Sequence, residues 1–524
     1  MKKFLALTLA LILCLGIFAG CGGNGRSGTE GNYQELDEQG NIWFDEPLQF
    51  TIVRARTDTQ QDWEYIIQLY KETCNVEINF VEKDQFGTWY NLAISNHDIP
   101  DVTYLNVNAY GNQYGREGAY VNIAEHLENM PNLMAALNAN PVYKDMWMNS
   151  DGTMYHIPIF SVGGDINPFT WFYREDVFKE LGLSWPDTRE GLEDLLRTLK
   201  SKGYSTPLCL RSLDETLSLL CDMGIAFGAK GLYYNRYGTY AQFDAESGQF
   251  YQSAISNEMK DMVSWIKQMM DEGLINKGAT NIKRADWFAR FANDSAVIGF
   301  DKIDQISLID EEGKRGNANF SLIAAAPIAM NASAPKAYVD SSTSIYSFVL
   351  AKSADRQKDI LSFIDWMYSK NGMLLSNWGK EGVDYTLDAN GNPQWTEAAL
   401  ANGNPQIKKG LAYAGLHTQL DFNAFYSYQP DNIKEAFAIV KPYQTEQTYY
   451  LTITEMFNKE EREYMTRYGV SYQMKVNGAL RDFILGNKKI SEWDSFVQQA
   501  TNDWKGADIV RKTNEAYNRV YGNK

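Results

Sequence analysis

Between residues 48 and 105, short apolar runs alternate with segments whose apolar residues recur at helical spacing. The pattern predicts strands over residues 48–53, 76–81 and 100–105, and helices over residues 63–70 and 86–94. Repeated strand–helix units specify a parallel sheet covered by helices, that is, an α/β fold class. Ligands of such sheets bind at loops after the carboxyl ends of the strands, and here these loops start at Arg54 and Asn106.

The rest of the chain continues this mixture of elements. We expect strands over residues 171–174, 296–300, 320–325 and 344–350, helices over 187–202, 253–271 and 355–369, and mostly helices beyond Asn371. A chain of 524 residues exceeds what one hydrophobic core fills. At least two lobes are therefore predicted.

The first twenty residues have the pattern of a secretory signal. Lys2 and Lys3 precede an apolar run over residues 4–18, which is shorter than the ~20 residues of a membrane span, and small residues follow it. Residues 1–20 are therefore predicted to be a signal peptide that exports the chain.

The residue after this signal is Cys21. Ala19-Gly20-Cys21 resembles the lipobox of bacterial lipoproteins, whose cysteine carries the lipid, although Phe18 stands where Leu is usual. The resemblance implies a lipid anchor at Cys21, with residues 21–45 as the lipidated start and flexible tether. The protein would then sit at the cell membrane, on its extracytoplasmic face. The alternative is an ordinary signal peptide with an incidental Cys21.

Charge and cysteine content exclude some functions. The net charge of −17 argues against nucleic acid as a partner. After Cys14 and Cys21, the cysteines are Cys74, Cys209 and Cys221, and their spacing fits no zinc site. Cys209 and Cys221 either pair or, as we favour, remain buried free thiols.

Catalytic motifs give no support for an enzyme. None of the four histidines lies in HExxH, and GxSxG, GxxxxGK[ST] and a GxGxxG after a strand are missing. Residues 388–392 look like a calcium loop, but Pro393 and Ala399 stand where Gly and Glu are needed, so we interpret this segment as a turn between strands. No enzyme activity, cofactor or metal is predicted, although two carboxylates suffice for a glycosidase.

Several segments, in order along the chain, resemble one protein family. They are Ile99–Val102, Tyr120–Glu125, Met130–Leu133, Asp151–Pro158, Trp171–Asp176, Leu181–Thr188, Trp378–Tyr385 and Asp388–Gly391. Together they resemble the lipid-anchored extracellular solute-binding proteins of ABC importers, in the large carbohydrate-type group of Gram-positive bacteria. One segment departs from the alginate-binding subgroup, because residues 200–207 hold no carboxylate where that subgroup has a calcium loop.

This resemblance implies a two-lobed periplasmic-binding-protein-like fold of type II, with a ligand cleft between the lobes and several hinge crossings. We place lobe one at residues 46–165 plus 320–372 and lobe two at residues 166–319 plus 373–524. An oligosaccharide would be captured in the cleft, and the closed form would deliver it to the permease subunits of the transporter. A monomer is expected. The alternatives are a surface-anchored glycoside-active enzyme and a receptor for a non-sugar solute such as a peptide.

A sugar cleft uses aromatic faces and planar polar groups, which strand-end loops supply. The candidate ligand-binding residues are Arg56, Asp58, Trp63, Asn106, Asn108, Tyr110, Trp171, Tyr173, Arg211, Asp301 and Trp378. Trp63 and Trp171 fit a core position equally well. Arg56 and Asp58 are also typical of solvated loop charges. Whether Arg56 and Arg211 face a uronate or a neutral sugar stays open at this point.

Overall fold

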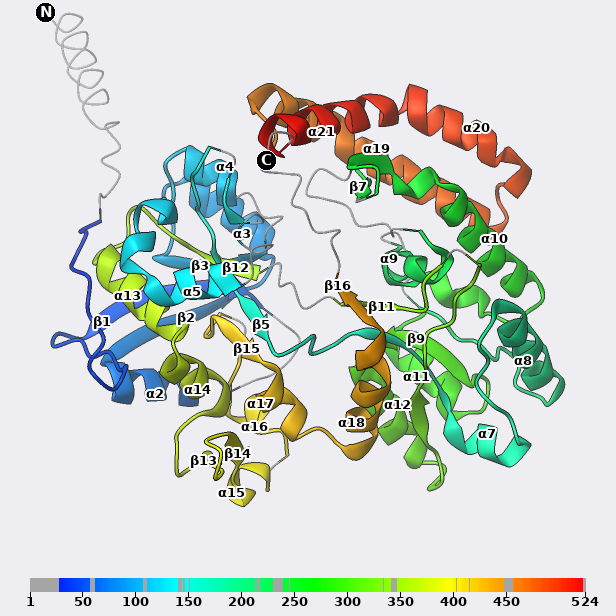
Figure 1. Ribbon diagram of the computed structural model, residues 1–524, viewed down its shortest axis with the longest axis horizontal. Coiled ribbons are helices and arrows are strands. Elements are labelled where there is room, and N and C mark those ends of the chain that lie inside the picture. The colour runs from blue at the N-terminus through cyan, green and yellow to red at the C-terminus, as the bar shows by residue number, and fades with distance from the viewer. Residues whose placement is uncertain are drawn as a thin grey trace, which may run out of the picture.

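The computed structural model describes residues 28–521, apart from 57–61, 107–110, 140–143, 145–146, 150, 212, 214–216, 230–238, 245, 333, 341–345, 402, 414 and 447–455. Figure 1 shows two lobes joined by a few connecting segments. Each lobe has its own large cluster of buried hydrophobic residues. The two-lobed α/β fold predicted from the sequence is therefore confirmed.

Lobe one is built on a five-stranded sheet. Its strand order is β2 (Val76–Lys83), β1 (Leu48–Ala55), β3 (Val102–Asn106), β12 (Tyr346–Leu350) and β4 (Ile157–Pro158). β1 pairs in parallel with β2 and β3, as predicted, whereas β12 is antiparallel to both of its neighbours.

Helices and small hairpins complete lobe one. The helices are α2 (Glu64–Cys74), α3 (Phe86–Ser95), α4 (Gly111–Arg116), α5 (Pro131–Ala139), α13 (Gln357–Met367), α14 (Lys370–Trp378), α15 (Glu397–Leu400), α16 (Pro405–Lys409) and α17 (Phe422–Ser427). The remaining strands are β5 (Phe160–Val162), β13 (Tyr385–Leu387), β14 (Pro393–Trp395) and β15 (Gln419–Asp421). β13 and β14 pair around residues 388–392, which confirms the predicted turn between strands.

Lobe two has a three-stranded antiparallel sheet and more helices. The sheet order is β10 (Leu322–Ala324), β6 (Phe169–Arg174) and β9 (Ile298–Lys302). The smaller strands are β7 (Ala241–Asp244), β8 (Gln249–Gln252), β11 (Tyr338–Asp340) and β16 (Gln444–Glu446). The helices are α7 (Glu175–Leu181), α8 (Arg189–Ser201), α9 (Ser218–Met223), α10 (Asn257–Asp271), α11 (Arg284–Ala292), α12 (Asp304–Lys314), α18 (Asp431–Val440), α19 (Lys459–Leu485), α20 (Trp493–Gln498) and α21 (Gly506–Tyr521).

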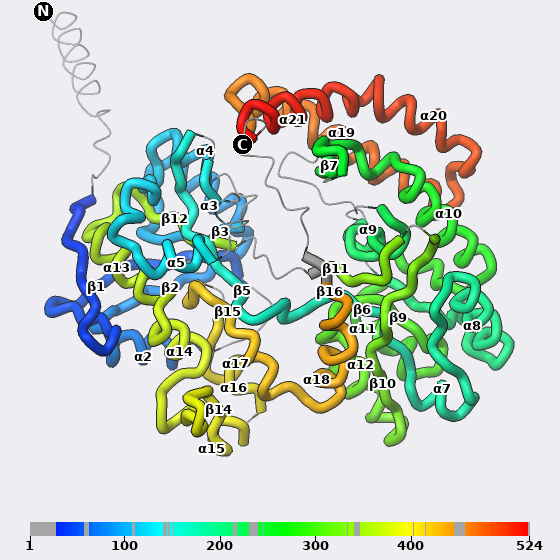
Figure 2. The backbone as a smooth tube through the Cα atoms, in the orientation of Figure 1, coloured from blue at the N-terminus to red at the C-terminus, as the bar shows by residue number. Residues whose placement is uncertain are grey.

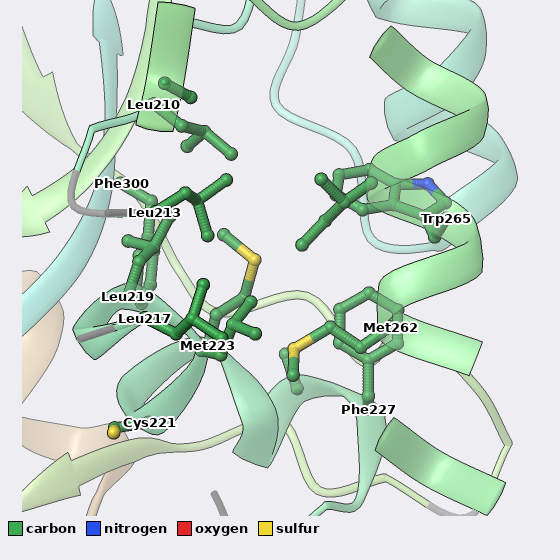
Figure 3. Packing of buried hydrophobic residues seen from close by; sticks show 14 of the residues in the cluster. Leu210, Leu213, Leu217, Leu219, Cys221, Met223, Phe227, Met262, Trp265 and Phe300 are labelled. Atoms are coloured by element: carbon green, nitrogen blue, oxygen red, sulfur yellow. The ribbon is translucent and has the colours of Figure 1, made fainter. Parts of the chain in front are cut away.

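The core of lobe two is packed from α9 and α10. Met262 and Trp265 of α10 are drawn with Leu213, Met223 and Phe227 in Figure 3, and all five side chains are fully buried. The rings of Trp265 and Phe227 lie 5.8 Å apart between centroids. Burying a side chain of this size contributes about 1.5–3 kcal/mol relative to leaving it exposed. The prediction that Cys209 and Cys221 are buried thiols rather than a disulfide is confirmed, and Cys74 is a buried thiol as well.

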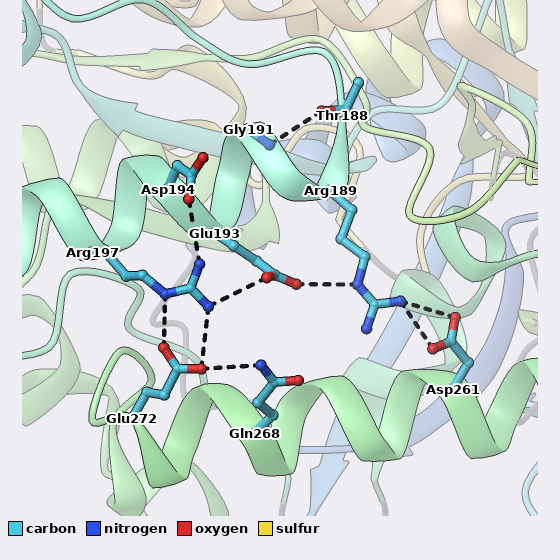
Figure 4. Close-up of polar contacts among 9 residues, drawn as sticks. All are labelled: Thr188, Arg189, Gly191, Glu193, Asp194, Arg197, Asp261, Gln268 and Glu272. Atoms are coloured by element: carbon cyan, nitrogen blue, oxygen red, sulfur yellow. Dashed lines mark hydrogen bonds and ion pairs between the residues drawn. The ribbon is translucent and has the colours of Figure 1, made fainter.

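A polar network joins α8 to α10 on the surface of lobe two (Figure 4). Arg189 lies 2.9 Å from Asp261, and Arg197 lies 2.9 Å from Glu272. Glu193 accepts from both arginines. Helix α8 starts where the sequence predicted, because the Thr188 hydroxyl accepts a hydrogen bond from the Gly191 N–H.

The division between the lobes differs from the predicted boundaries. Residues 320–330 and Tyr338 belong to lobe two, because β10 pairs with residues 172–174 of β6 and the buried side chains of this stretch join the core of that lobe. Residues 373–424 belong to lobe one, where Trp378 packs 4.7 Å from Trp395 between ring centroids. Residues 28–45, expected in the tether, pack on lobe one, where Ile42 and Phe44 are buried. Such assignments depend on contacts distant in sequence, which local patterns do not reveal.

Two of the segments that resemble the family, Met130–Leu133 and Trp378–Tyr385, are held in lobe one by buried carboxylates. Asp365 accepts hydrogen bonds from the backbone N–H groups of Asn132 and Leu133 at the start of α5. Asp384 accepts from the Tyr65 hydroxyl at 2.5 Å and from the Lys380 N–H at 2.8 Å. These segments therefore serve the fold itself.

Two described segments of the chain run between the lobes (Figure 2). One follows β5 and the other lies between α17 and α18, whereas β11 belongs to lobe two and β12 to lobe one. Several crossings of this kind let two lobes rotate without unfolding.

Candidate functional site

One edge of the lobe-one sheet, formed by the carboxyl ends of its parallel strands, faces lobe two. Tyr346, the first residue of β12, pairs with Asn106, the last residue of β3. β1 and β2 run parallel to β3, so their carboxyl ends reach the same edge. We call this edge, with residues 54–56, 82–84, 106 and 346, the facing edge of lobe one. It is the edge at which the sequence predicted ligand loops.

Stacked aromatic rings form part of this edge. The rings of Tyr104 and Tyr346 stack at 5.3 Å between centroids and 13° between planes. Tyr346 is 43% exposed, whereas Tyr104 is buried beneath it. Nearby, Trp63 stacks on Tyr413 at 5.6 Å. An exposed ring supported by a second ring is a rigid apolar surface, which suits the C–H face of a sugar.

Arg54 lies between the two pairs of rings. Its guanidinium is 5.4 Å from the Tyr104 centroid and 4.8 Å from the Tyr413 centroid, so both rings make cation–π contacts with it. Its Nε is 3.7 Å from the Glu82 carboxylate, which also accepts a 2.6 Å hydrogen bond from the Tyr413 hydroxyl. Because Arg54 is only 5% exposed, the rings and Glu82 hold it in one orientation.

A histidine supports this cluster from the interior. His417 is buried, and its Nδ1–H donates to the Tyr413 carbonyl at 2.8 Å. Burial lowers the pKa of His417 to about 4, and the nearby positive charge of Arg54 lowers this pKa as well. The imidazole is therefore neutral near pH 7 and acts as a packing and hydrogen-bonding group.

Two glycines allow the Tyr413 segment to approach the rings. Gly410 has a φ of 63°, and a Cβ there would lie 2.3 Å from the Asp62 carbonyl oxygen. Gly415 has a φ of 99°, and a Cβ there would lie 3.1 Å from the Phe80 ring. Only glycine fits both the left-handed backbone and the close contact.

The facing edge of lobe two, with residues 169, 211, 301 and 302, is organised by an ion pair. Phe169 at the start of β6 pairs with Lys302 at the end of β9, close to the crossing from lobe one. Next to them, the Arg211 guanidinium lies 2.6 Å from the Asp301 carboxylate. Burial raises the pKa of Asp301, and Arg211 opposes this rise. Arg211 also lies 5.1 Å from the centroid of the Trp287 ring.

Several candidate residues lie on these edges. Arg56 is exposed and lies 3.3 Å from Asp84. Trp63 and Asn106 are half-buried on lobe one. Arg211 and Asp301, which the sequence offered separately, form one pair on lobe two. Three further candidates, Asp58, Asn108 and Tyr110, lie outside the described residues.

Three other candidates are placed in packed positions. Trp171 is 1% exposed in the core of lobe two, and Trp378 is 1% exposed and donates to the Asp421 carboxylate. Tyr173 is half-buried and stacks on Trp185, away from the crossing. Because neither tryptophan presents a ring face to solvent, the expectation that they contact a solute requires a correction. Both rings are occupied in packing.

Sequence reasoning placed Arg54 at the start of a ligand loop without naming it as a contact, and it missed Glu82, Tyr104, Tyr346 and Tyr413. A weak signal existed for Arg54, a charged residue at the end of an apolar strand. Tyr413 gave none, since it reaches Glu82 from 331 residues away along the chain.

Among the residues that the structure describes, no helix has the length and hydropathy that a membrane crossing requires.

Residues 56–373, well over half of the chain, match the family described as bacterial extracellular solute-binding protein. The chain belongs to this family. Two relatives of this solute-binding protein are each 22% identical to it. Lipoprotein LipO of Bacillus subtilis matches over 325 residues, which are 60% of this chain and 62% of LipO. The fructooligosaccharide ABC transporter substrate-binding protein FusA of Streptococcus pneumoniae matches over 525 residues, with 94% of this chain and 92% of FusA covered.

Solved structures share the fold of this solute-binding protein. Alginate-binding protein AlgQ2 without calcium ion has a TM-score of 0.71 at 20% identity, with 91% of this chain and 99% of AlgQ2 covered. A solute-binding protein from Bifidobacterium longum infantis, associated with an HMO-binding ABC transporter, has a TM-score of 0.69 at 16% identity, with the same coverage. FusA in complex with kestose has a TM-score of 0.67 at 19% identity, with 91% of this chain and 100% of FusA covered. These similarities establish the two-lobed solute-binding fold.

Proposed function

We propose that this solute-binding protein captures an oligosaccharide between its facing edges and delivers it, uncleaved, to the permease subunits of an ABC importer. The observation that carries the proposal is the exposed Tyr346 ring, stacked on Tyr104 and next to Arg54, at the edge that faces lobe two. The family supports binding of a solute, and the printed ligands of FusA support a saccharide. Closure of the lobes would bring the Arg211–Asp301 pair against the same ligand.

The candidate residues on the facing edges take part in this proposal. Tyr346 and Trp63 would contact sugar faces, and Asn106 and Arg56 would contact hydroxyl groups. Asp58, Asn108 and Tyr110 continue the same loops and stay proposed contacts from the sequence alone.

Binding without cleavage is supported by the state of the buried carboxylates. A glycosidase needs one carboxyl group as acid and another as base or nucleophile. Glu82 is engaged by Arg54 and the Tyr413 hydroxyl, and Asp301 by Arg211 and the Lys302 N–H. Groups held in this way are poorly placed to exchange protons with a substrate.

Calorimetric titration with a panel of oligosaccharides tests the proposal, with reducing ends assayed in the same samples. We expect at least one saccharide to bind and no new reducing ends to appear. Tyr346→Ala should weaken this binding by about tenfold, because the ligand loses a ring face. Trp43→Ala is the matched control, since Trp43 is 55% exposed outside the facing edges. Failure of every saccharide to bind, or release of product, would refute the proposal.

The location is part of the same proposal. Cys21 would carry a lipid that holds a monomeric protein on the extracytoplasmic face of the membrane, as the name of LipO also indicates for that relative. Labelling with radioactive palmitate should mark the wild-type chain and fail to mark Cys21→Ser. Equal labelling of both chains would contradict the anchor.

A further inference from the structure

Each described arginine of the two facing edges has a carboxylate partner from the protein itself. Arg54 is 3.7 Å from Glu82, Arg56 is 3.3 Å from Asp84, and Arg211 is 2.6 Å from Asp301. An arginine that recognises an acidic sugar presents its guanidinium fork to the ligand's carboxylate. Here each fork already has an anion beside it.

Two of these carboxylates are built into the protein. The side chains of Glu82 and Asp301 are 9% and 3% exposed. Glu82 also accepts from the Tyr413 hydroxyl at 2.6 Å, and Asp301 from the Lys302 N–H at 2.8 Å. These hydrogen bonds fix both anions, so neither can move aside when a ligand arrives.

A ligand carboxylate would therefore meet like charge. To reach Arg54 or Arg211, a uronate would come within a few ångströms of Glu82 or Asp301. In a partly buried site, this repulsion is much stronger than in water. Sugar hydroxyls avoid the cost, because a hydroxyl can donate to the carboxylate and accept from the guanidinium at the same time.

The other cations near the facing edges offer weaker attraction. Lys83 lies over the Trp89 ring at 5.4 Å, and Lys302 lies 6.0 Å from the Phe169 ring. Arg284 is exposed and donates to the Gln305 side chain at 2.9 Å. Hydrated charges at a surface are screened by salt, and the net charge of −17 opposes the approach of anions.

We propose that Glu82 and Asp301 are specificity determinants that make the site select neutral saccharides over uronate-containing ones. This inference rests on the proposed function, because it concerns the same site. For Arg211, which the sequence left open between a uronate and a neutral sugar, the inference favours the neutral ligand.

The test uses the full chain and two matched panels. One contains neutral fructo-, gluco- and xylo-oligosaccharides, and the other contains oligogalacturonates and alginate oligosaccharides of similar length. Calorimetry should show the best neutral ligand binding at least about tenfold more tightly than any uronate, with little change between low and high salt.

Charge-neutralising variants test the role of the carboxylates. Asp301→Asn releases Arg211 and should raise uronate affinity about tenfold at low salt, while neutral binding falls because a sugar hydroxyl loses the carboxylate to which it donates. Glu82→Gln repeats the test at Arg54 if Asp301→Asn does not fold. Glu272→Gln is the matched control, because it neutralises the partner of Arg197 on the outer surface of lobe two.

The outcomes separate this inference from the proposed function. If neutral saccharides bind the wild type and Asp301→Asn gains affinity for uronates, both the inference and the proposed function are supported. Uronates that bind wild type as tightly as neutral sugars would overturn the inference and leave saccharide capture intact. If no member of either panel binds, saccharide capture itself is wrong, and the inference is wrong with it.

Discussion

Lobe one and lobe two each bury an arginine, but at opposite ends of their sheets. Arg54 lies at the end of β1 that faces lobe two, with one carboxylate at 3.7 Å and two aromatic rings around it. Arg174 lies at the far end of β6, where Asp176 and Asp294 are 2.6 Å and 2.9 Å away. Both arginines are almost fully buried. Burial alone therefore does not distinguish a structural arginine from one in the proposed binding site, and the two differ in their position relative to the crossings.

The surroundings of the two arginines also differ, because core groups enclose Arg174 and partly exposed rings lie near Arg54. The guanidinium of Arg174 also donates to the Phe291 carbonyl at 2.8 Å and stacks 4.0 Å from the centroid of Phe320, so core groups surround it. The two tyrosine rings beside Arg54 stack on the half-buried Trp63 and on the exposed Tyr346, where a solute can reach them. The contacts of Arg174 stabilise the core of lobe two, whereas the contacts of Arg54 hold aromatic rings at an accessible surface.

Replacing Arg174 should give the largest effect on stability. Arg174→Met leaves Asp176 and the Phe291 carbonyl without their partner, and breaking a buried ion pair costs about 3–5 kcal/mol. The midpoint of urea unfolding, followed by circular dichroism, measures this loss. Arg197→Met is the matched control, because its surface pairs contribute at most about 1 kcal/mol. An Arg174→Met midpoint equal to that of Arg197→Met would show that buried Arg174 stabilises lobe two no more than a surface arginine does.

Mild acid should destabilise lobe one before lobe two. All four histidines belong to lobe one, and burial lowers the pKa of His417 from 6.5 to about 4. Above pH 6.5 the histidine is neutral in both the folded and unfolded chain, so its full contribution is present. Between pH 6.5 and 4 only the unfolded chain binds the proton, so stability falls as the pH falls, by about 3 kcal/mol in total.

Hydrogen exchange read by mass spectrometry checks this order. At pH 4.5, peptides from β1 and β3 should lose protection relative to pH 7, whereas peptides from β6 and β9 should keep it. His417→Gln supplies the control, since its stability should no longer depend on pH through this group. Equal loss of protection in both lobes would show that the acid sensitivity does not come from the lobe-one histidines.

The sequence predicted the elements better than their assembly. The strands that became β1, β2 and β3 were predicted within two residues at each end, because apolar runs and helical spacing are local signals. The assignment of β10 to lobe two could not be predicted locally, because it depends on pairing with β6, which lies about 150 residues earlier.

The same limit applies to the candidate site. Arg211 and Asp301 were chosen because each follows a strand, and the structure adds that they neutralise one another. Tyr104 and Tyr346 are 242 residues apart and meet only because β3 and β12 pair in register. A tyrosine that stacks on a distant ring has the same local pattern as one in the core.

Arg56 gives the smallest and most discriminating test of the comparison. It follows Arg54 by two residues and has its own carboxylate, yet the side chains of Arg56 and Asp84 are 57% and 74% exposed. An ion pair in water contributes at most about 1 kcal/mol and is screened by salt, so Arg56→Gln should leave the urea midpoint almost unchanged.

The affinity of Arg56→Gln for a neutral saccharide should fall by less than about threefold, since hydrated side chains exchange one hydrogen bond for another at little cost. Calorimetry and urea unfolding on the same preparation measure both values, with Asp84→Asn as the matched partner. A stability loss as large as that of Arg174→Met would show that partner charges, rather than burial at the far end of the sheet, decide which arginines hold this protein together.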